Sequence, residues 1–136
     1  MSTRPASQAL RADALAEAVT GGAGGLWTSV RIVASTGSTN ADLLARGGPE
    51  GQVLVAEEQT AGRGRAGRTW VSQPGASLTF SVLLRPVTVP PSARGWLPLL
   101  TGVAVAAGVR SASGVAASLK WPNDVQIGRA SCRERV

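Results

Sequence analysis

Three short segments of the sequence hold the side chains whose types and spacing could do chemistry. The first is residues 59–70, in which glycines alternate with Arg63, Arg65 and Arg68. Glycines let a backbone approach a ligand closely and expose its N–H groups, and guanidinium groups bind phosphate or carboxylate through paired hydrogen bonds. The segment therefore predicts a loop that wraps an anion, with a solvated flexible turn as the alternative.

The glycines of this segment, Gly62, Gly64 and Gly67, also match the G-x-G-x-x-G pattern of dinucleotide-binding proteins. That pattern needs a helix directly after it, which residues 71–75 cannot supply, so we exclude this interpretation. Ordering some ten backbone residues costs on the order of 10 kcal/mol, and like-charged arginines repel one another. We therefore expect the loop to be mobile when empty and to fold around a bound anion.

The other two segments are shorter and allow two interpretations each. Residues 38–40, Ser-Thr-Asn, supply small donors and acceptors that could bind a polar head group, or they simply cap a helix. Residues 120–124, Lys-Trp-Pro-Asn-Asp, supply a cation, an amide that could read a purine and a carboxylate for Mg²⁺, or they end a strand in a turn. We interpret Glu57 and Glu58 as solvated charges at the end of a strand.

Composition narrows the classes of function. The chain has 136 residues, enough for one domain at most, and its 43% hydrophobic residues predict a packed core. It has no His and one Cys, which excludes His general bases, zinc or haem sites that need His, and an intrachain disulfide. We find neither an apolar span nor a secretory signal, and expect a cytoplasmic protein with no membrane partner. The net charge of +6 leaves open a basic nucleic-acid-binding module.

The elements that must position these segments follow from hydrophobic spacing. It predicts helices over residues 7–19, 41–46 and 93–112, and strands over residues 30–33, 53–56, 77–84 and 118–121. We expect Thr39 or Asn40 to cap the second helix and the apolar third helix to be buried. The irregular order of helices and strands favours an α+β fold.

Taken together, the three segments resemble the biotin protein ligase family over residues 30–125. The resemblance rests on Gly-Ser-Thr-Asn at 37–40, Glu-Gln-Thr-Ala-Gly-Arg-Gly-Arg-x-Gly-Arg-x-Trp at 58–70 and Lys-Trp-Pro-Asn-Asp at 120–124. It implies an α+β mixed sheet with flanking helices, as in class II aminoacyl-tRNA synthetases. It also implies ligation of biotin to a lysine of a biotin carboxyl carrier protein of acetyl-CoA carboxylase through biotinyl-5′-AMP, with biotin and ATP as substrates and Mg²⁺. A lipoate ligase is the alternative within the superfamily.

The resemblance implies roles for individual residues. Gln59 would bind the ureido ring of biotin, and the biotin site as a whole would comprise Ser38, Thr39, Asn40, Gln59, Gly62, Arg63, Gly64 and Arg65. The ATP and adenylate site would comprise Arg63, Arg65, Arg68, Trp70, Lys120, Asn123 and Asp124. Arg63 and Arg65 would be catalytic because they hold the biotin carboxylate and the α-phosphate together. Asp124 would be the metal ligand.

The places where this sequence differs from the family's pattern determine the domain organisation that we expect. Residues 1–27 predict a helix and a glycine-rich loop, too short for the DNA-binding domain of bifunctional members, so we expect no specific DNA binding. Residues 28–125 would be an incomplete catalytic domain, because the lysine-containing segment that follows Lys-Trp-Pro-Asn-Asp in the family is missing, and we expect weak activity at best. Residues 126–136 resemble a translated sequencing adapter, and we expect a non-native, poorly ordered tail.

Overall fold

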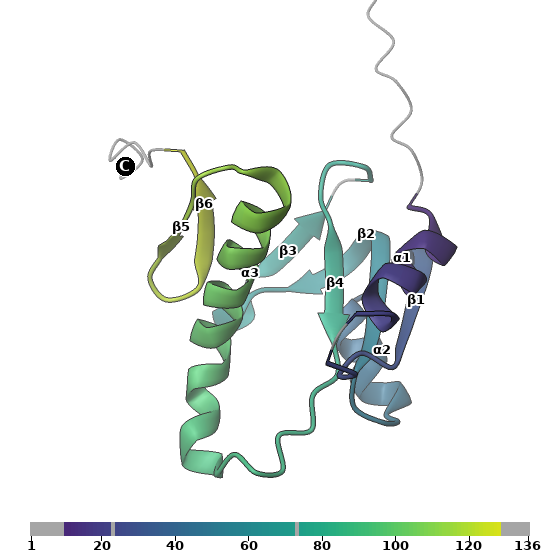
Figure 1. Cartoon of the computed structure of the whole chain (residues 1–136), viewed down its shortest axis with the longest axis horizontal. Helices are drawn as coiled ribbons and strands as arrows, with labels where there is room; N and C mark the ends of the chain where they lie inside the picture. The colour runs from purple at the N-terminus through teal and green to yellow at the C-terminus, as the bar shows by residue number, and fades with distance from the viewer. Residues whose placement is uncertain (1–9, 23, 73, 129–136) are drawn as a thin grey trace, which may run out of the picture. The chain divides into compact units, whose positions relative to one another are not determined.

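The structure is a computed structural model of the whole chain, and it describes residues 10–22, 24–72 and 74–128. Its contacts divide the chain into two compact units, with the boundary after Arg85 (Figure 1). None of the helices in these described ranges is long and apolar enough to cross a membrane. The predicted segments 38–40 and 59–70 belong to the first unit and 120–124 to the second.

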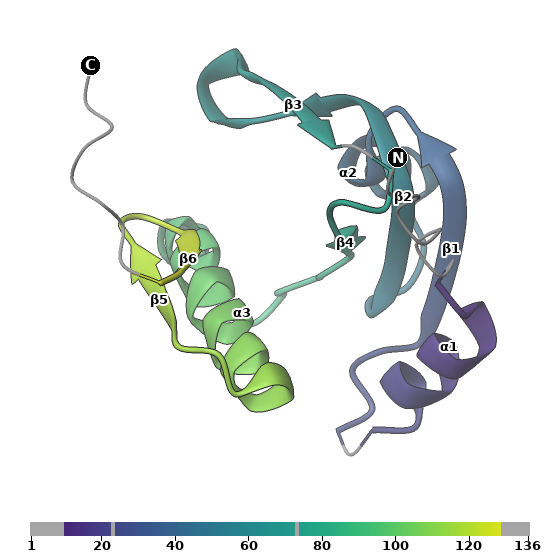
Figure 2. The same cartoon turned by 90° about the horizontal axis from the view of Figure 1, so that it is seen from above.

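The first unit is built on one long strand. β2 (Gln52–Arg63) pairs in parallel with β1 (Ser29–Thr36) along one edge. Along its other edge β2 pairs with two antiparallel strands in succession, β4 (Thr79–Val82) near its start and β3 (Thr69–Ser72) near its end (Figure 2). Parallel strands need a crossover connection, and α2 (Thr39–Arg46) supplies it between β1 and β2.

The core of this unit lies in the first half of β2. Residues Val53, Leu54, Val55 and Ala56 are all buried, as expected for a run of apolar residues in a strand covered on both faces. α2 contributes Leu43, which is 5% exposed, and α1 (Ala12–Thr20) packs against β1. α1 therefore belongs to the same unit as the sheet.

The second unit is a helix with a hairpin packed on it. A 3₁₀ helix (Pro91–Trp96) leads into α3 (Leu97–Ser113), and β5 (Ala117–Lys120) pairs antiparallel with β6 (Asp124–Ile127). Gly102 of α3 makes the close packing possible, because a Cβ there would lie 3.1 Å from Leu119 Cδ2 and 3.3 Å from Asn123 Cα.

The predicted α+β class with a mixed sheet is confirmed, and several boundaries are wrong. β2 was expected to end at residue 56 but runs to Arg63, because its backbone keeps pairing with β1 and then β3 after the apolar run stops. Glu57 and Glu58 therefore lie within the strand. β1 is longer and β4 shorter than predicted, and α1 starts at Ala12, with residues 7–9 of the predicted helix outside the described residues.

The second unit also differs from the prediction. α3 starts at Leu97 because residues from Pro91 wind as 3₁₀, and only Gly102 and Ala106 of α3 are buried, since within its unit the single hairpin covers one side. β5 ends before Trp121. β6 was not predicted, and it includes Gln126 and Ile127 from the segment expected to be a poorly ordered tail. Residues 129–136 of that segment lie outside the described residues.

The close packing at Gly102 gives a test of this fold. Gly102→Val should lower the free energy of unfolding by about 1–3 kcal/mol, the usual cost of overpacking, in urea titrations followed by circular dichroism. Gly108→Val is the matched control, because it places the same side chain on the same helix where a Cβ would meet no atom within 4 Å. Equal stabilities of the two variants would contradict the packing of the hairpin on α3.

Candidate ligand-binding site

The glycine–arginine segment forms the end of a hairpin. Gly62 and Arg63 close β2 and pair with Trp70 and Thr69 of β3, and the Gly64 N–H donates a hydrogen bond to the Arg68 carbonyl at 2.6 Å. The turn itself is a short 3₁₀ segment, Arg65–Gly67. The predicted loop is thus partly strand, because β3 offers its backbone groups as partners.

The tip of the hairpin reverses through two residues in the left-handed region, Ala66 with φ 57° and Gly67 with φ 75°. Gly67 adopts this conformation without steric cost, whereas Ala66 carries a Cβ in it. The chain thereby turns back within five residues and keeps the arginines on both sides of the turn.

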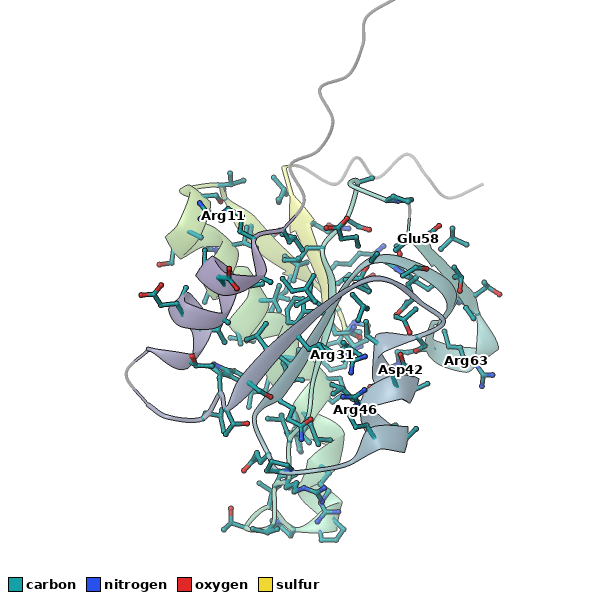
Figure 3. The ribbon with its side chains drawn as sticks, turned by 90° about the vertical axis from the view of Figure 1, so that its right-hand side faces the viewer. Arg11, Arg31, Asp42, Arg46, Glu58 and Arg63 are labelled. Atoms are coloured by element: carbon teal, nitrogen blue, oxygen red, sulfur yellow. The ribbon has the colours of Figure 1, made fainter. Side chains whose placement is uncertain are left out.

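The charged and aromatic side chains of the hairpin face outward. Arg63, Arg65 and Arg68 are exposed, and Trp70 is 61% exposed. Figure 3 shows Arg63 on the outer side of the hairpin, away from Arg31, which lies on β1. Three guanidinium groups on one short turn form a positive surface able to take a phosphate or a carboxylate.

At the base of this hairpin lies a buried polar network centred on Gln59. The Gln59 side-chain oxygen accepts hydrogen bonds from the Thr39 N–H at 3.0 Å and from the Thr39 hydroxyl at 3.3 Å. The Gln59 N–H donates to the Ser72 hydroxyl oxygen at 3.0 Å, and Thr39 Oγ1 lies 2.8 Å from Ser81 Oγ. Thr39 is 2% exposed and Gln59 8%, so these groups are held by one another rather than by solvent.

Gly62 is required by this network. The pairing of β2 with β3 shifts register between Gln59 and Gly62, which brings the Gln59 side chain over the glycine. A Cβ at Gly62 would overlap the amide nitrogen of Gln59 and lie 2.5 Å from the Trp70 carbonyl oxygen. The Gln59 amide therefore occupies the position that a side chain at residue 62 would take.

Residues 38–40 lie beside this network at the start of α2. Ser38 is the N-cap residue, not Thr39 or Asn40 as predicted, and its hydroxyl oxygen accepts from the Ala41 N–H at 3.3 Å. Thr39 instead points into the network, and Asn40 is exposed. The Ala61 N–H donates to the Gly37 carbonyl at 2.8 Å. The structure therefore brings segments 38–40 and 59–70 together.

Residues 120–124 form the turn of the second unit. Lys120 and Asp124 are directly opposite each other in the β5–β6 pair and are exposed, whereas Asn123 is partly buried. Trp121 and Pro122 line an apolar hollow of about 580 Å³ together with side chains of α3. In the described part of the chain no group of three or more His, Cys, Asp or Glu residues could hold a metal ion, so Asp124 is a single carboxylate.

Sequence reasoning missed Ser72 and Ser81. Ser81 belongs to the polar half of the alternating pattern in residues 77–84, which was used only to predict a strand. That polar half was the available signal, because a serine on a strand of a packed sheet needs a hydrogen-bond partner. Its partner Thr39 is 42 positions away and could not be identified without the sheet register.

Residues 30–130 match the model of the Biotin/lipoate A/B protein ligase family. The match covers most of the chain and includes all three segments described above. The chain belongs to this family.

Curated relatives within the family are biotin ligases. A biotin–[acetyl-CoA-carboxylase] ligase of Mycobacterium tuberculosis is 50% identical over 111 residues, 76% of this chain and 42% of the relative. The bifunctional ligase/repressor BirA of Bacillus subtilis is 43% identical over 96 residues, 71% of this chain and 29% of the relative. The chain thus spans less than half the length of these relatives.

Solved structures agree with the fold. The biotin protein ligase of Aquifex aeolicus in complex with biotin and ATP is 38% identical with a TM-score of 0.64, over 73% of this chain and 41% of that one. The Leishmania major enzyme in complex with biotinyl-5-AMP is 31% identical with a TM-score of 0.59, over 72% and 47%.

The contact between Gly62 and Gln59 can be tested by adding one methyl group. Gly62→Ala should lower the free energy of unfolding by about 1–3 kcal/mol in urea titrations, because the new Cβ forces the Gln59 amide or the β3 backbone to move. Gly64→Ala is the control, since its nearest neighbour would be an ordinary 3.4 Å away, at Arg68 Cβ. The account is wrong at this position if Gly62→Ala is no less stable than Gly64→Ala.

Proposed function

We propose that this chain carries the biotin- and adenylate-binding part of a biotin protein ligase. The reaction is the ATP-dependent ligation of biotin to a lysine of a biotin carboxyl carrier protein through biotinyl-5′-AMP. The observation that carries the proposal is the arginine hairpin standing directly on the buried Gln59 network, in a chain that belongs to the ligase family. The names of the Mycobacterium tuberculosis relative and of the Aquifex aeolicus structure favour biotin over lipoate as the acyl group.

The chemistry needs positive charge more than it needs a nucleophile. A carboxylate oxygen of biotin attacks the α-phosphorus of ATP, and pyrophosphate leaves. The lysine amine of the carrier then attacks the acyl carbon of the adenylate, and AMP leaves. In the first step two anions must approach, and Arg63 and Arg65 would offset their repulsion by hydrogen-bonding the carboxylate and the α-phosphate. No His or Cys of the protein is needed.

The residues divide between the two ends of the ligand. The neutral groups around the base of the hairpin would hold biotin: Ser38, Thr39, Asn40, Gln59, Gly62 and Gly64. Arg68 and Trp70, farther along the hairpin, would hold the adenylate, together with Lys120, Asn123 and Asp124. Within the first unit, the separation of a buried neutral network from the exposed cations of the hairpin supports this division. The three residues of the second unit are assigned from the family resemblance alone.

Mg²⁺ fits the donor set of the second unit. Magnesium is usually held by one or two carboxylates together with substrate phosphates and waters, so the single carboxylate of Asp124 is a suitable protein ligand. When bound, the ion would neutralise charge on the ATP phosphates. We place the reaction in the cytoplasm, where the carboxylase partner would be found.

Removal of one arginine tests the proposal. Arg63→Ala should weaken binding of a non-hydrolysable biotinyl-adenylate analogue by about 2–3 kcal/mol, the scale of a lost charge-assisted hydrogen bond, in isothermal titration calorimetry. Arg46→Ala is the control, because it removes the same charge from α2, outside the hairpin. Unchanged affinity in Arg63→Ala would refute the assigned role of the hairpin.

Limited proteolysis of the unsubstituted protein distinguishes the ligase function from that of a basic nucleic-acid-binding module. Binding of the analogue should protect the Arg63, Arg65 and Arg68 bonds from trypsin, because the hairpin closes on its ligand. DNA binding that falls steeply with salt, with no effect of biotin or the adenylate on cleavage, would favour the nucleic-acid module instead.

A further inference from the structure

Ser81 takes part in the network although no role follows for it from the family motifs. It lies on β4, opposite Leu54 of β2, and its hydroxyl oxygen is 2.8 Å from Thr39 Oγ1. Thr39 in turn contacts the side-chain oxygen of Gln59 through two donors. Ser81, Thr39 and Gln59 therefore form a continuous hydrogen-bonded chain from β4 to β2.

The direction of hydrogen-bond donation among these three side chains follows from the Thr39 N–H group. The Thr39 N–H can only donate, so the Gln59 atom that faces it must be the oxygen and not the nitrogen of the amide. The same oxygen accepts from the Thr39 hydroxyl, which has one proton to give. Thr39 Oγ1 must therefore accept from Ser81, and donation runs from Ser81 to Thr39 to Gln59.

This direction decides what Gln59 offers to a ligand. With its oxygen held by Thr39, the amide nitrogen lies on the side of Gly62, where a Cβ would overlap it. Among the described residues that nitrogen donates no hydrogen bond, and no fully enclosed side-chain polar atom there lacks a partner. The NH₂ group of Gln59 is thus an accessible donor, and the subsite above Gly62 suits a ligand atom that accepts.

We propose that Ser81 is a positioning residue that, through Thr39, holds the Gln59 amide with its NH₂ group toward the ligand, so that this subsite selects a ring carbonyl oxygen and rejects an N–H donor. The inference rests on the proposed function, in which that ring is the ureido ring of biotin. Without the Ser81 donor, the Thr39 hydroxyl is free to reorient, so only the Thr39 N–H fixes the Gln59 oxygen and the NH₂ group is held less firmly toward the ligand.

The test compares biotin with 2-iminobiotin, in which the ring carbonyl oxygen is replaced by a nitrogen that carries hydrogen at neutral pH. Calorimetry on the whole chain should show that the unsubstituted protein prefers biotin. Ser81→Ala should raise the Kd for biotin about threefold to tenfold, the scale of one neutral hydrogen bond, and should lower the preference for biotin over 2-iminobiotin. Ser81→Thr, which keeps the hydroxyl, should retain both values.

If Ser81 only stabilises the fold, its removal should change the melting temperature and not the preference between the two ligands. Thr28→Val is the control, because it removes a hydroxyl that donates to the Glu50 carbonyl at 3.0 Å, away from the network. A lower melting temperature of Ser81→Ala with an unchanged preference between the two ligands would overturn the inference and leave the proposed function intact. If Ser81→Ala does not fold, Ser81→Cys supplies the same comparison with a weak donor of similar shape.

Absence of biotin binding by the unsubstituted chain would instead overturn the proposed function, and the inference with it. An unsubstituted chain that binds biotin and 2-iminobiotin equally would overturn the inference alone. The preference ratio of the unsubstituted chain therefore separates the two failures.

Discussion

The two hydrogen bonds that the Gln59 side-chain oxygen accepts from Thr39 are the contact on which the candidate site depends. They join the first turn of α2 to the part of β2 where its pairing with β3 shifts register. α2 is the crossover between the parallel strands β1 and β2. Because both residues are nearly enclosed, leaving either group without a partner would cost about 1–3 kcal/mol. The need for glycine at Gly62 follows from the same contact, since the Gln59 amide occupies the position of its missing side chain.

In the candidate site, the neutral side chains and the charged side chains occupy different places. The neutral groups are buried at the base of the hairpin and hold one another in fixed orientations, which suits the recognition of a small uncharged ring. Arg63 and Arg68 stand near the tip and are exposed to solvent, so the protein avoids the cost of burying these charges. One hairpin therefore presents a rigid neutral surface and a charged surface within a few residues of each other.

Part of the fold could be predicted from the sequence, whereas the exact strand ends and side-chain orientations could not. The alternation of glycine and arginine identified residues 59–70, and the apolar run of residues 53–56 identified the buried strand. The extension of β2 to Arg63 could not be predicted, because it depends on backbone pairing with β3 rather than on hydrophobic spacing. The cap at Ser38 and the hydrogen bond of Ser81 were missed for a similar reason: only the fold decides which of several adjacent polar side chains points into the interior.

Heteronuclear NMR of the whole chain, titrated with biotin, tests the central claim most directly. If the network at the base of the hairpin is the biotin site, the side-chain amide of Gln59 and the backbone amide of Thr39 should shift together and saturate with one ligand per chain, while Gly108 on α3 stays unchanged. Binding of biotin that leaves the Gln59 and Thr39 signals in place, or titration with no shift at either, would contradict the account.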